Sequence, residues 1–358
     1  MDFKSYFDIP EGLLYFNTPG NGLLPKSHNT WREERDQTFY TPHGTLRDTQ
    51  GDFVEQVRGD IARLFHTTSS SVFCVPNFSF GYNTLLAGLP IDLPVILLEG
   101  EYPSVHYPLY SRGFKCVKIK MDEQLEQNIK NAILPNTAQV LLLSIVQYIS
   151  GAKIDLDFIK ELKQLNPQLY IVGDATQYLG VTHFDFDNSG FDAIGASGYK
   201  WLMAGFGNGF MLINERLRAT LYQEAQQKSL PSEAMWAGKS LLHIYFEPGH
   251  IDTLALGTLW QSILFLEQLN LKNINKHLVT LTEHAYRELD DRHLLLPIAR
   301  LRKEKSSLIN IQLNPNLYPK LVESGIRCFP RGTGIRIGIH LYNNADDLSK
   351  LLKIIDAL

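Results

Sequence analysis

The sequence has few cysteines, no long apolar run and no recognisable leader segment. Cys74, Cys116 and Cys328 show no CxxC spacing and lie in apolar, strand-like contexts. We therefore predict neither a disulfide framework nor a zinc site and expect buried thiols. No apolar stretch approaches the ~18–20 residues that a membrane-spanning helix needs. Because Met1–Asp8 also lacks the basic and apolar regions of a signal peptide, we expect a cytoplasmic protein without a membrane partner.

Charge and motif patterns exclude further classes of function. The chain has 34 Lys and Arg against 38 Asp and Glu, a formal net charge of −4, so we expect no nucleic-acid partner. The 11 histidines show no HExxH or paired ligand spacing, and no catalytic metal is predicted. The run Gly205–Gly209 (GFGNG) lacks the GxGxxG register of NAD-binding proteins, and no GxSxG elbow is present.

What the chain does have is the length for about two domains, with 358 residues of which 44% are hydrophobic. Short β-branched or leucine-rich runs alternate with longer helix-like stretches. This rhythm predicts an α/β fold with a mostly parallel sheet covered by helices on both faces. The seven predicted strands are Ser71–Val75, Pro94–Leu98, Lys115–Ile119, Gln139–Ile145, Leu169–Val172, Ala193–Ala196 and Gly209–Ile213.

The helical spacing of apolar residues predicts a helix over Asp155–Leu165 and a long helix from Thr253 to about Leu271, which would link two domains. From about residue 272 to residue 358 the pattern of apolar residues changes and predicts a helix, a strand, a helix, a strand and a final helix. The two strands are predicted at Leu308–Leu313 and Gly334–Ile339, and the last helix at Ala345–Leu358.

This change of pattern predicts two domains. The large one would span residues 20–265, and a smaller α+β domain would span residues 266–358. Residues 1–19 are expected to pack against the smaller domain.

Lys200 is the most informative single residue. It follows the apolar strand 193–196 and is surrounded by small and aromatic residues. Desolvation there would lower the pKa of the amine and make it a usable nucleophile. Taken alone, however, a lysine at a strand end is more often a solvated charge.

A second apolar strand ends in Asp174, with Gln177 three residues on. Because polar residues at the carboxyl ends of parallel strands face the ligand crevice, Asp174 and Lys200 should open into one site. Pyridoxal phosphate needs this pair: a lysine for the Schiff base, and an acid that keeps the pyridine nitrogen protonated. The alternative is a buried ion pair, which costs desolvation.

The third feature is the segment Val75–Gly88, a strand leading through a polar turn into an apolar helix. Ser79 and the free amides at the helix N-terminus would hold a phosphate. The alternative is that Ser79 is an ordinary N-cap.

In order along the chain, these segments resemble the class V aminotransferase family of fold-type I pyridoxal-phosphate enzymes, which also holds cysteine desulfurases, selenocysteine lyases and isopenicillin N epimerase. The resemblance covers nearly the whole chain. It implies a homodimer with the site at the subunit interface. The matching stretches are Tyr15–Pro25, Asn77–Asn83, Glu101–Ser104, Asp174–Gln177, Ser197–Lys200 and Ile335–Asn343.

The resemblance also implies roles for single residues. Lys200 would form the Schiff base and Asp174 would pair with the pyridine nitrogen, which makes these two the catalytic residues. Arg336 would bind the substrate carboxylate with its planar fork, and Asn17 would also contact substrate. The remaining cofactor contacts would be Phe78, Ser79 and Ser197 at the phosphate, Tyr102 stacked on the ring and Gln177 at the phenolic oxygen.

Three places depart from the family pattern. Tyr199 replaces the usual histidine before the lysine, at a contact with the cofactor phosphate. His250 or Thr253 would substitute for the residue that reaches the phosphate of the neighbouring subunit. Gln147 or Tyr148 would contact the cofactor's ring oxygen.

We therefore expect an aminotransferase that acts on an amino acid and a 2-oxo acid through Lys200. The alternatives within the family are cysteine desulfurase or selenocysteine lyase activity and epimerisation, and outside it a non-catalytic protein with this fold. Cys328 lies near the place of the desulfurase nucleophile, but its apolar neighbours indicate a structural thiol. Arg331 is either a second substrate-binding cation or a solvated loop charge.

Overall fold

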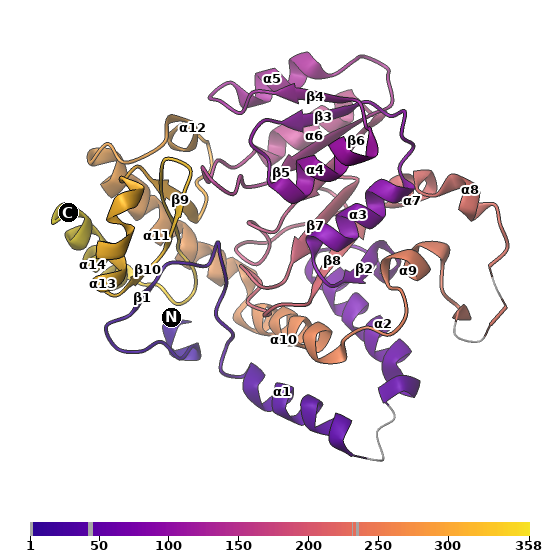
Figure 1. The fold of residues 1–358 in the computed structure, drawn as a ribbon, viewed down its shortest axis with the longest axis horizontal. Coiled ribbons are helices and arrows are strands. Elements are labelled where there is room, and N and C mark those ends of the chain that lie inside the picture. Colours follow the sequence, from indigo (N-terminus) through magenta and orange to yellow (C-terminus); the bar gives the residue numbers. More distant parts are fainter. Residues whose placement is uncertain (1–2, 42–45, 231, 234–235) are drawn as a thin grey trace.

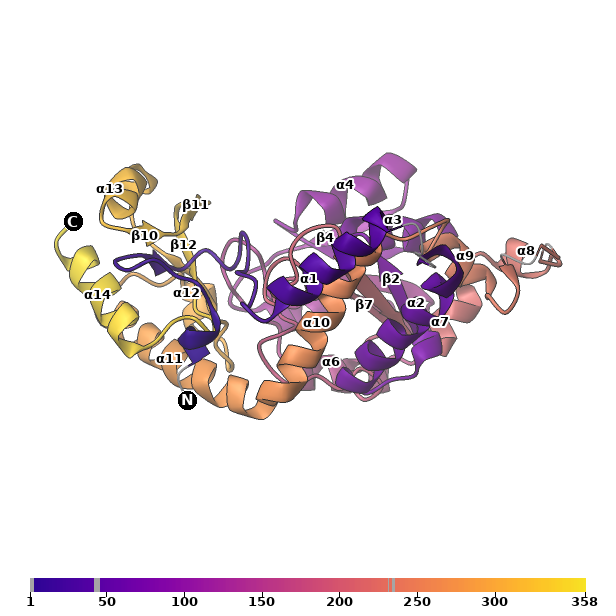
Figure 2. The same cartoon turned by 90° about the horizontal axis from the view of Figure 1, so that it is seen from below.

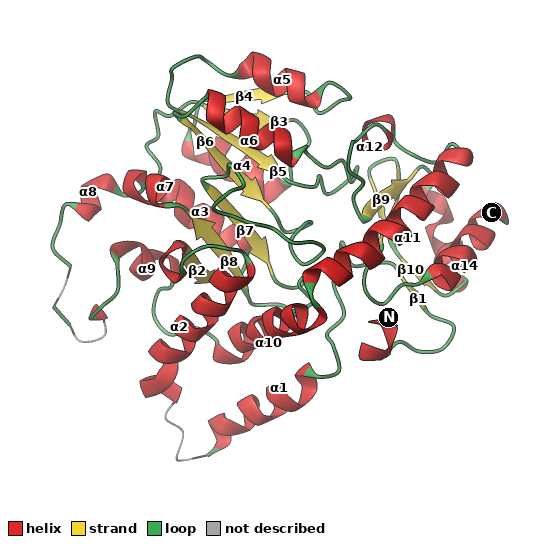
Figure 3. Ribbon diagram, turned by 180° about the vertical axis from the view of Figure 1, so that it is seen from behind, coloured by secondary structure: helices red, strands yellow, loops and turns green. Residues whose placement is uncertain are grey.

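The computed structural model describes residues 3–41, 46–230, 232–233 and 236–358. A seven-stranded sheet lies at its centre, and a smaller α/β part is built from the C-terminal residues (Figures 1 and 3). In spatial order the large sheet consists of β2 (Val72–Val75), β8 (Gly209–Ile213), β7 (Ala193–Ser197), β6 (Leu169–Asp174), β5 (Gln139–Ser144), β3 (Val95–Leu98) and β4 (Cys116–Ile119). These are the seven strands that the sequence predicts, with ends that differ by no more than two residues.

The sheet is parallel except for β8, which runs antiparallel to both of its neighbours. Along β5 the side chains alternate between two hydrophobic clusters: Val140 and Leu142 join one, and Leu141 and Leu143 join the other. A strand that is apolar on both faces needs cover on both. The predicted arrangement of helices on the two faces is therefore confirmed.

The helices divide between these two faces. One cluster takes buried residues from α3 (Phe78–Gly88), α4 (Pro103–Arg112), α7 (Glu215–Thr220) and α9 (Leu241–Phe246). The other takes them from α2 (Leu46–Leu64), α5 (Leu125–Ala132), α6 (Leu156–Leu165) and α10 (Thr253–Leu269). Helix α1 (His28–Gln37) lies alongside α10 (Figure 2), and α8 (Gln223–Gln226) extends away from the sheet. Single 3₁₀ turns lie at Phe3–Tyr6, Thr38–Tyr40, Ser69–Ser71 and Pro315–Leu317.

The predicted long helix from Thr253 to about Leu271 is α10 (Thr253–Leu269), which ends two residues earlier than predicted. Asn270 adopts a positive φ of 64°, and its side chain caps the next helix by accepting a hydrogen bond from the amide of Lys272. Helix α10 thus ends at Leu269 and α11 (Leu271–Asp291) begins directly after the break.

The C-terminal part holds a three-stranded antiparallel sheet of β11 (Phe329–Arg331), β12 (Gly334–Gly338) and β9 (Leu308–Ile311). The sequence predicted β9 and β12 but not β11 as a separate strand. Helices α11, α12 (Pro297–Arg300), α13 (Tyr318–Glu323) and α14 (Ala345–Asp356) complete this part.

The N-terminal segment runs beside this C-terminal part. Strand β1 (Leu14–Tyr15) pairs in parallel with β10 (Ile326–Arg327), Asn17 forms a bridge with Gly338, and Lys4 forms an ion pair with Asp347. The division into domains at residue 265 stays a prediction. None of the described helices is long and apolar enough to cross a membrane.

Candidate active site

A cavity of about 490 Å³ opens at the carboxyl ends of the parallel strands. Nine of the predicted site residues line it: Phe78, Ser79, Tyr102, Tyr148, Asp174, Gln177, Ser197, Tyr199 and Lys200. The strand register explains how they meet, because Asp174 at the end of β6 pairs with Gly195 on β7, five residues before Lys200. The structure therefore brings these nine residues together in one cavity, and Asn17, Gln147, His250, Thr253 and Arg336 lie outside its lining.

Lys200 lies half-buried among aromatic rings. Its Nζ is 5.3 Å from the ring centroid of Tyr199 and 6.0 Å from that of Tyr102. Burial lowers the pKa of Lys200 to about 8, Asp174 opposes this, and the positive charges of Arg336 and Arg331 lower the pKa further. A much larger fraction of this amine is neutral near pH 7 than in an ordinary lysine, so it is a usable nucleophile and base.

Asp174 faces the same cavity. Burial raises the pKa of its carboxyl group, whereas hydrogen bonds from the side chain and the amide of Thr176, the latter at 2.9 Å, and the charge of Lys200 lower it. The carboxylate lies at the end of β6, and both of these hydrogen bonds come from one residue. It therefore keeps acceptor capacity for a cationic group that enters the cavity.

The N-terminus of α3 forms one wall. Asn77 is the N-cap: its side chain accepts a hydrogen bond from the amide of Phe80 at 2.9 Å. The alternative interpretation of Ser79 as the N-cap is therefore wrong, because asparagine two residues earlier takes that place. Ser197 Oγ accepts from the amide of Phe78 at 2.9 Å, which ties the helix start to the end of β7. Helix amides and two serines at one wall fit an anionic phosphate.

Aromatic side chains form the mouth of the cavity. Tyr102 is 39% exposed and makes an edge-to-face contact with Tyr148, with ring centroids 5.1 Å apart. Tyr199 stacks on Phe206 at 4.8 Å. The residues of the lining that the sequence reasoning missed are Pro76, Asn77, Ser144, Val146, Thr176, Phe206 and Gly207. Thr176 lies inside the quoted Asp174–Gln177 motif and was within reach of that reasoning.

The two glutamines differ in position. Gln177 lines the cavity, but its Nε2 donates to the carbonyl of Pro19 and its Oε1 accepts from Trp201 Nε1. Gln147 is buried outside the lining, where it donates to Gly100 O and accepts from the turn that follows it. Of the two candidates for the ring-oxygen contact, only Tyr148 reaches the cavity.

Arg336 is 4% exposed and lies on β12 of the smaller sheet. Its Nη1 donates to the carbonyl of Tyr148 at 2.8 Å, and its Nε has no partner. Burial lowers the pKa of Arg336 to about 10, and Arg331 lowers it further. Asn17 Oδ1 is also buried without a partner, near the same strand. Such unpartnered polar atoms are costly unless a ligand completes their hydrogen bonds.

His250 and Thr253 lie outside the cavity lining. His250 is exposed and contacts Gln50 Oε1 through Nδ1 at 3.2 Å, and Thr253 Oγ1 accepts from Arg35 Nε at 3.2 Å. Because the predicted role of these residues is a contact with the neighbouring subunit, it stays a prediction.

The three cysteines are free. Burial raises the pKa of Cys328 to about 12 and raises that of Cys74 well above its usual range. Cys116 is only half-buried, so the expectation of a buried thiol is wrong there because β4 is the edge strand of the sheet. None of the three has the exposed, low-pKa environment of a nucleophilic thiol.

Glu101 is a buried carboxyl group behind the cavity that the sequence reasoning did not assign. Its Oε1 accepts from the amide of Ser144 at 2.7 Å and its Oε2 from the hydroxyl of that residue at 2.5 Å. Burial raises the pKa of Glu101 to about 7 although these hydrogen bonds lower it. In the sequence, the only indication of a role for Glu101 is its place directly before Tyr102 in the matching stretch Glu101–Ser104.

The donor set fits a flat aromatic aldehyde that carries a ring nitrogen and a phosphate. Lys200 supplies the amine, Asp174 the acceptor for a ring N–H, Tyr102 a face for stacking, and the start of α3 the phosphate site. The aldehyde of such a group would react with the neutral amine of Lys200, and its ring nitrogen would pair with the carboxylate of Asp174.

Comparison with known proteins gives consistent results. The model of the family described as Aminotransferase class-V matches residues 42–351. An uncharacterised aminotransferase of Schizosaccharomyces pombe is 23% identical over 371 residues, which cover 96% of this chain and 90% of that protein.

Two solved structures share the fold. The apo cysteine desulfurase of Thermococcus onnurineus NA1 has a TM-score of 0.83 at 16% identity and covers 99% of this chain and 97% of its own. C-DES has a TM-score of 0.81 at 17% identity and covers 97% of this chain. One C-DES structure has glycine covalently linked to its pyridoxal phosphate, and the match covers 97% of that chain. The other is described as the cystine C-S lyase in complex with its product cysteine persulfide, and the match covers 98% of that chain.

Proposed function

This chain belongs to the class V aminotransferase family and is a fold-type I enzyme that depends on pyridoxal phosphate; on that premise we propose that it transfers an amino group from an amino acid to a 2-oxo acid. The observation that carries this proposal is the meeting of Lys200 and Asp174 in one cavity, with Arg336 held beside it through Tyr148 and no reactive thiol near it.

When bound, pyridoxal phosphate supplies an electrophilic carbon and a ring that accepts the electron pair released at the substrate's α-carbon. The carboxylate of Asp174 would hold the proton on the ring nitrogen. Ser79 at the start of α3 and Ser197 at the end of β7 would bind the phosphate, and the ring of Tyr102 would cover the face of the cofactor.

Lys200 moves the proton. Its amine would take the α-proton of the substrate and return a proton to the carbon of the cofactor that carried the aldehyde. Water would then cleave the carbon–nitrogen bond, which releases the 2-oxo acid and leaves the amino group on the cofactor. The low pKa of Lys200 suits this role because the neutral amine must be available at physiological pH.

Arg336 orients the substrate. The Nε with no partner and the remaining Nη hydrogens can donate to the α-carboxylate as a planar pair of hydrogen bonds. Arg336 would therefore direct the α-carbon of the substrate towards Lys200, between the aromatic rings of Tyr102, Tyr148 and Tyr199.

A second candidate is C–S lyase activity, as the printed name of C-DES says for that protein. The high pKa of Cys328 argues against a persulfide on this chain, so a lyase reaction here would need a substrate that retains the sulfur in its own product. The first proton removal by Lys200 is common to both reactions.

One experiment separates the two. The visible absorption of the cofactor-loaded protein is recorded before and after adding each of a panel of amino acids without any oxo acid. Amino-group transfer predicts a lasting loss of the visible band, with pyridoxamine phosphate and an oxo acid formed in equal amounts. Recovery of the band with release of sulfide or a persulfide would support the lyase, and absence of any band after adding cofactor would contradict both.

We also propose a homodimer in which His250 or Thr253 reaches the phosphate of the partner. His250 supports this because it is exposed and lies outside the cavity of its own chain. Thr253 is 2% exposed and accepts a hydrogen bond from Arg35, so His250 is the better placed of the two. Light scattering of the purified protein tests the homodimer, and a monomer that is active at all concentrations would contradict it.

A further inference from the structure

The three-stranded sheet turns one face towards the loop that carries Tyr148. Arg336 on β12 donates to Tyr148 O, and Asn310 Nδ2 on β9 donates to Ile149 O at 3.0 Å. At the tip of the β11–β12 hairpin, a Cβ on Gly332 would lie 2.7 Å from Cγ2 of Ile149. The hairpin thus packs directly on the loop that carries Tyr148 to the cavity, and β11 lies on the side of the C-terminal part that faces the large sheet (Figure 2).

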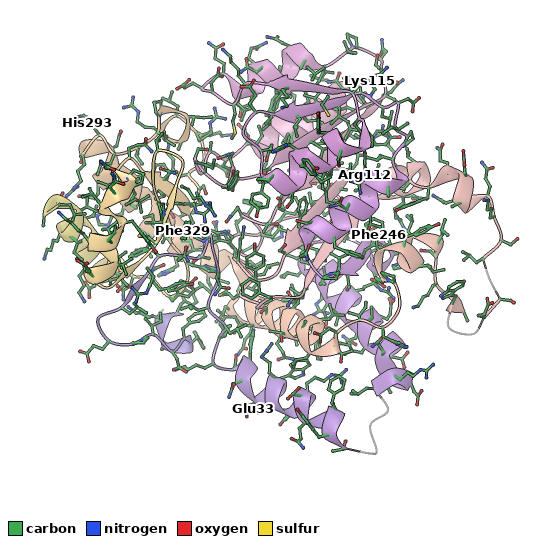
Figure 4. The ribbon with its side chains drawn as sticks, viewed as in Figure 1. Glu33, Arg112, Lys115, Phe246, His293 and Phe329 are labelled. Carbon is green, nitrogen blue, oxygen red and sulfur yellow. The ribbon has the colours of Figure 1, made fainter. Side chains whose placement is uncertain are left out.

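The register places a second arginine on this face. Phe329 pairs with Arg336, and Arg331 pairs with Gly334. Directly paired residues of antiparallel strands project to the same side, as do alternate residues along one strand. Phe329, Arg331 and Arg336 therefore share one face of the sheet, the face from which Arg336 reaches the Tyr148 carbonyl, and Figure 4 shows Phe329 between the C-terminal part and the large sheet.

Arg331 is exposed at this edge. Its guanidinium carbon lies 4.9 Å from the ring centroid of Phe329, and its carbonyl accepts a hydrogen bond from Asn310 Nδ2 at 2.9 Å. In the part of the chain that the structure describes, no carboxylate forms an ion pair with Arg331 or with Arg336. The charge of Arg331 lowers the pKa of both Lys200 and Arg336, after the larger effect of burial.

Arg331 and Arg336 are two cations without a carboxylate partner in the described residues, and a neutral amino acid can pair with only one of them. Asp174 is reserved for the ring nitrogen, and Lys200 for the cofactor. The α-carboxylate of any amino acid occupies Arg336 alone. An arrangement of like charges of this kind favours a ligand with two negative groups, because each cation then gains its own partner.

Resting on the proposed function, we propose that Arg331 binds a second anionic group of the substrate, so that the amino donor is an acidic amino acid with a side-chain carboxylate. Arg336 binds the α-carboxylate that all amino acids share, and Arg331 favours those amino acids that also carry a side-chain carboxylate. Phe329 holds the guanidinium of Arg331 against its ring.

The test compares two probes that lack an α-proton and so bind without turning over: 2-methylaspartate and 2-aminoisobutyrate. Each is titrated into the cofactor-loaded protein and its Kd is read from the change in visible absorption. The wild-type protein should bind 2-methylaspartate about tenfold or more tightly than 2-aminoisobutyrate, as a charge-assisted pair of hydrogen bonds predicts.

The variants assign this preference to one side chain. Arg331→Gln should remove the preference and leave the Kd of 2-aminoisobutyrate within about twofold, whereas Arg331→Lys should retain part of it because the charge remains but the fork is lost. Arg327→Gln, an exposed arginine on β10, is the matched control and should behave as wild type.

Equal affinities for the two probes in the wild type would overturn the inference while leaving the proposed function intact. An equal weakening of both probes in Arg331→Gln would do the same, because Arg331 would then act without selecting a side chain. A protein that shows no visible band with added cofactor would overturn the proposed function and this inference with it.

Discussion

The end of β7 and the junction of β10 with β11 each hold a nucleophile withdrawn from solvent, Lys200 and Cys328. Burial disfavours the charged form in both places, but the charged form is the unreactive ammonium of lysine and the reactive thiolate of cysteine. Desolvation therefore lowers the pKa of Lys200 to about 8 and raises that of Cys328 to about 12. Desolvation thus makes the amine of Lys200 more reactive and the thiol of Cys328 less reactive.

The largest effect is expected at Lys200. Lys200→Ala removes both the amine that binds the cofactor and the base, so activity should fall by about 10⁴-fold or more and the visible band should be lost. Absorption spectra and initial rates measure this. Lys160→Ala, on the exposed surface of α6, is the control; a Lys200→Ala protein that keeps the band would refute the assignment.

The next largest effect is expected at Asp174. Asp174→Asn cannot hold the proton on the ring nitrogen as an anion does, so kcat should fall by about 10²–10⁴-fold with a smaller change in KM. Steady-state kinetics measure both constants. Asp157→Asn, an exposed aspartate of α6, should be neutral. A kcat of Asp174→Asn near that of the wild type would mean that another group protonates the ring.

The pH dependence of cofactor binding tests the lowered pKa of Lys200. The rate of cofactor uptake by stripped protein should rise with pH through about 8 and then level off, because only the neutral amine reacts. An ordinary lysine would give a midpoint near ~10.4. Since the charge of Arg336 lowers the pKa of Lys200, Arg336→Gln should move the midpoint upward, and Arg327→Gln should leave it in place. A midpoint that Arg336→Gln lowers would contradict this electrostatic account.

The smallest effect on activity is expected at Cys328. Cys328→Ser should change kcat by less than about twofold, although a hydroxyl in this apolar site should cost about 1–3 kcal/mol of unfolding free energy. Rates and urea denaturation measure the two quantities, and Cys116→Ser on the half-buried edge strand is the control. A large loss of activity without a loss of stability would return Cys328 to the candidates for a nucleophile.

The sequence predicted the cavity because its main residues follow apolar strands or begin a helix, and both patterns are local. Lys200, Asp174 and the start of α3 were found in this way. Gln147 was not separable from Tyr148, because a turn decides which of two adjacent side chains faces inward. Phe206 and Glu101 were missed for a related reason: their positions depend on loop geometry and on packing between distant segments, which no local spacing encodes.

The hydrogen bond from Arg336 to Tyr148 O has a consequence for affinity. A free arginine side chain that is fixed by a ligand loses ~2 kcal/mol of rotamer entropy. Arg336 is already buried and tethered, with Nε turned away from any protein acceptor, so this loss occurs when the chain folds and not when substrate arrives. The site meets its ligand preorganised, and a larger share of each new hydrogen bond remains as binding free energy.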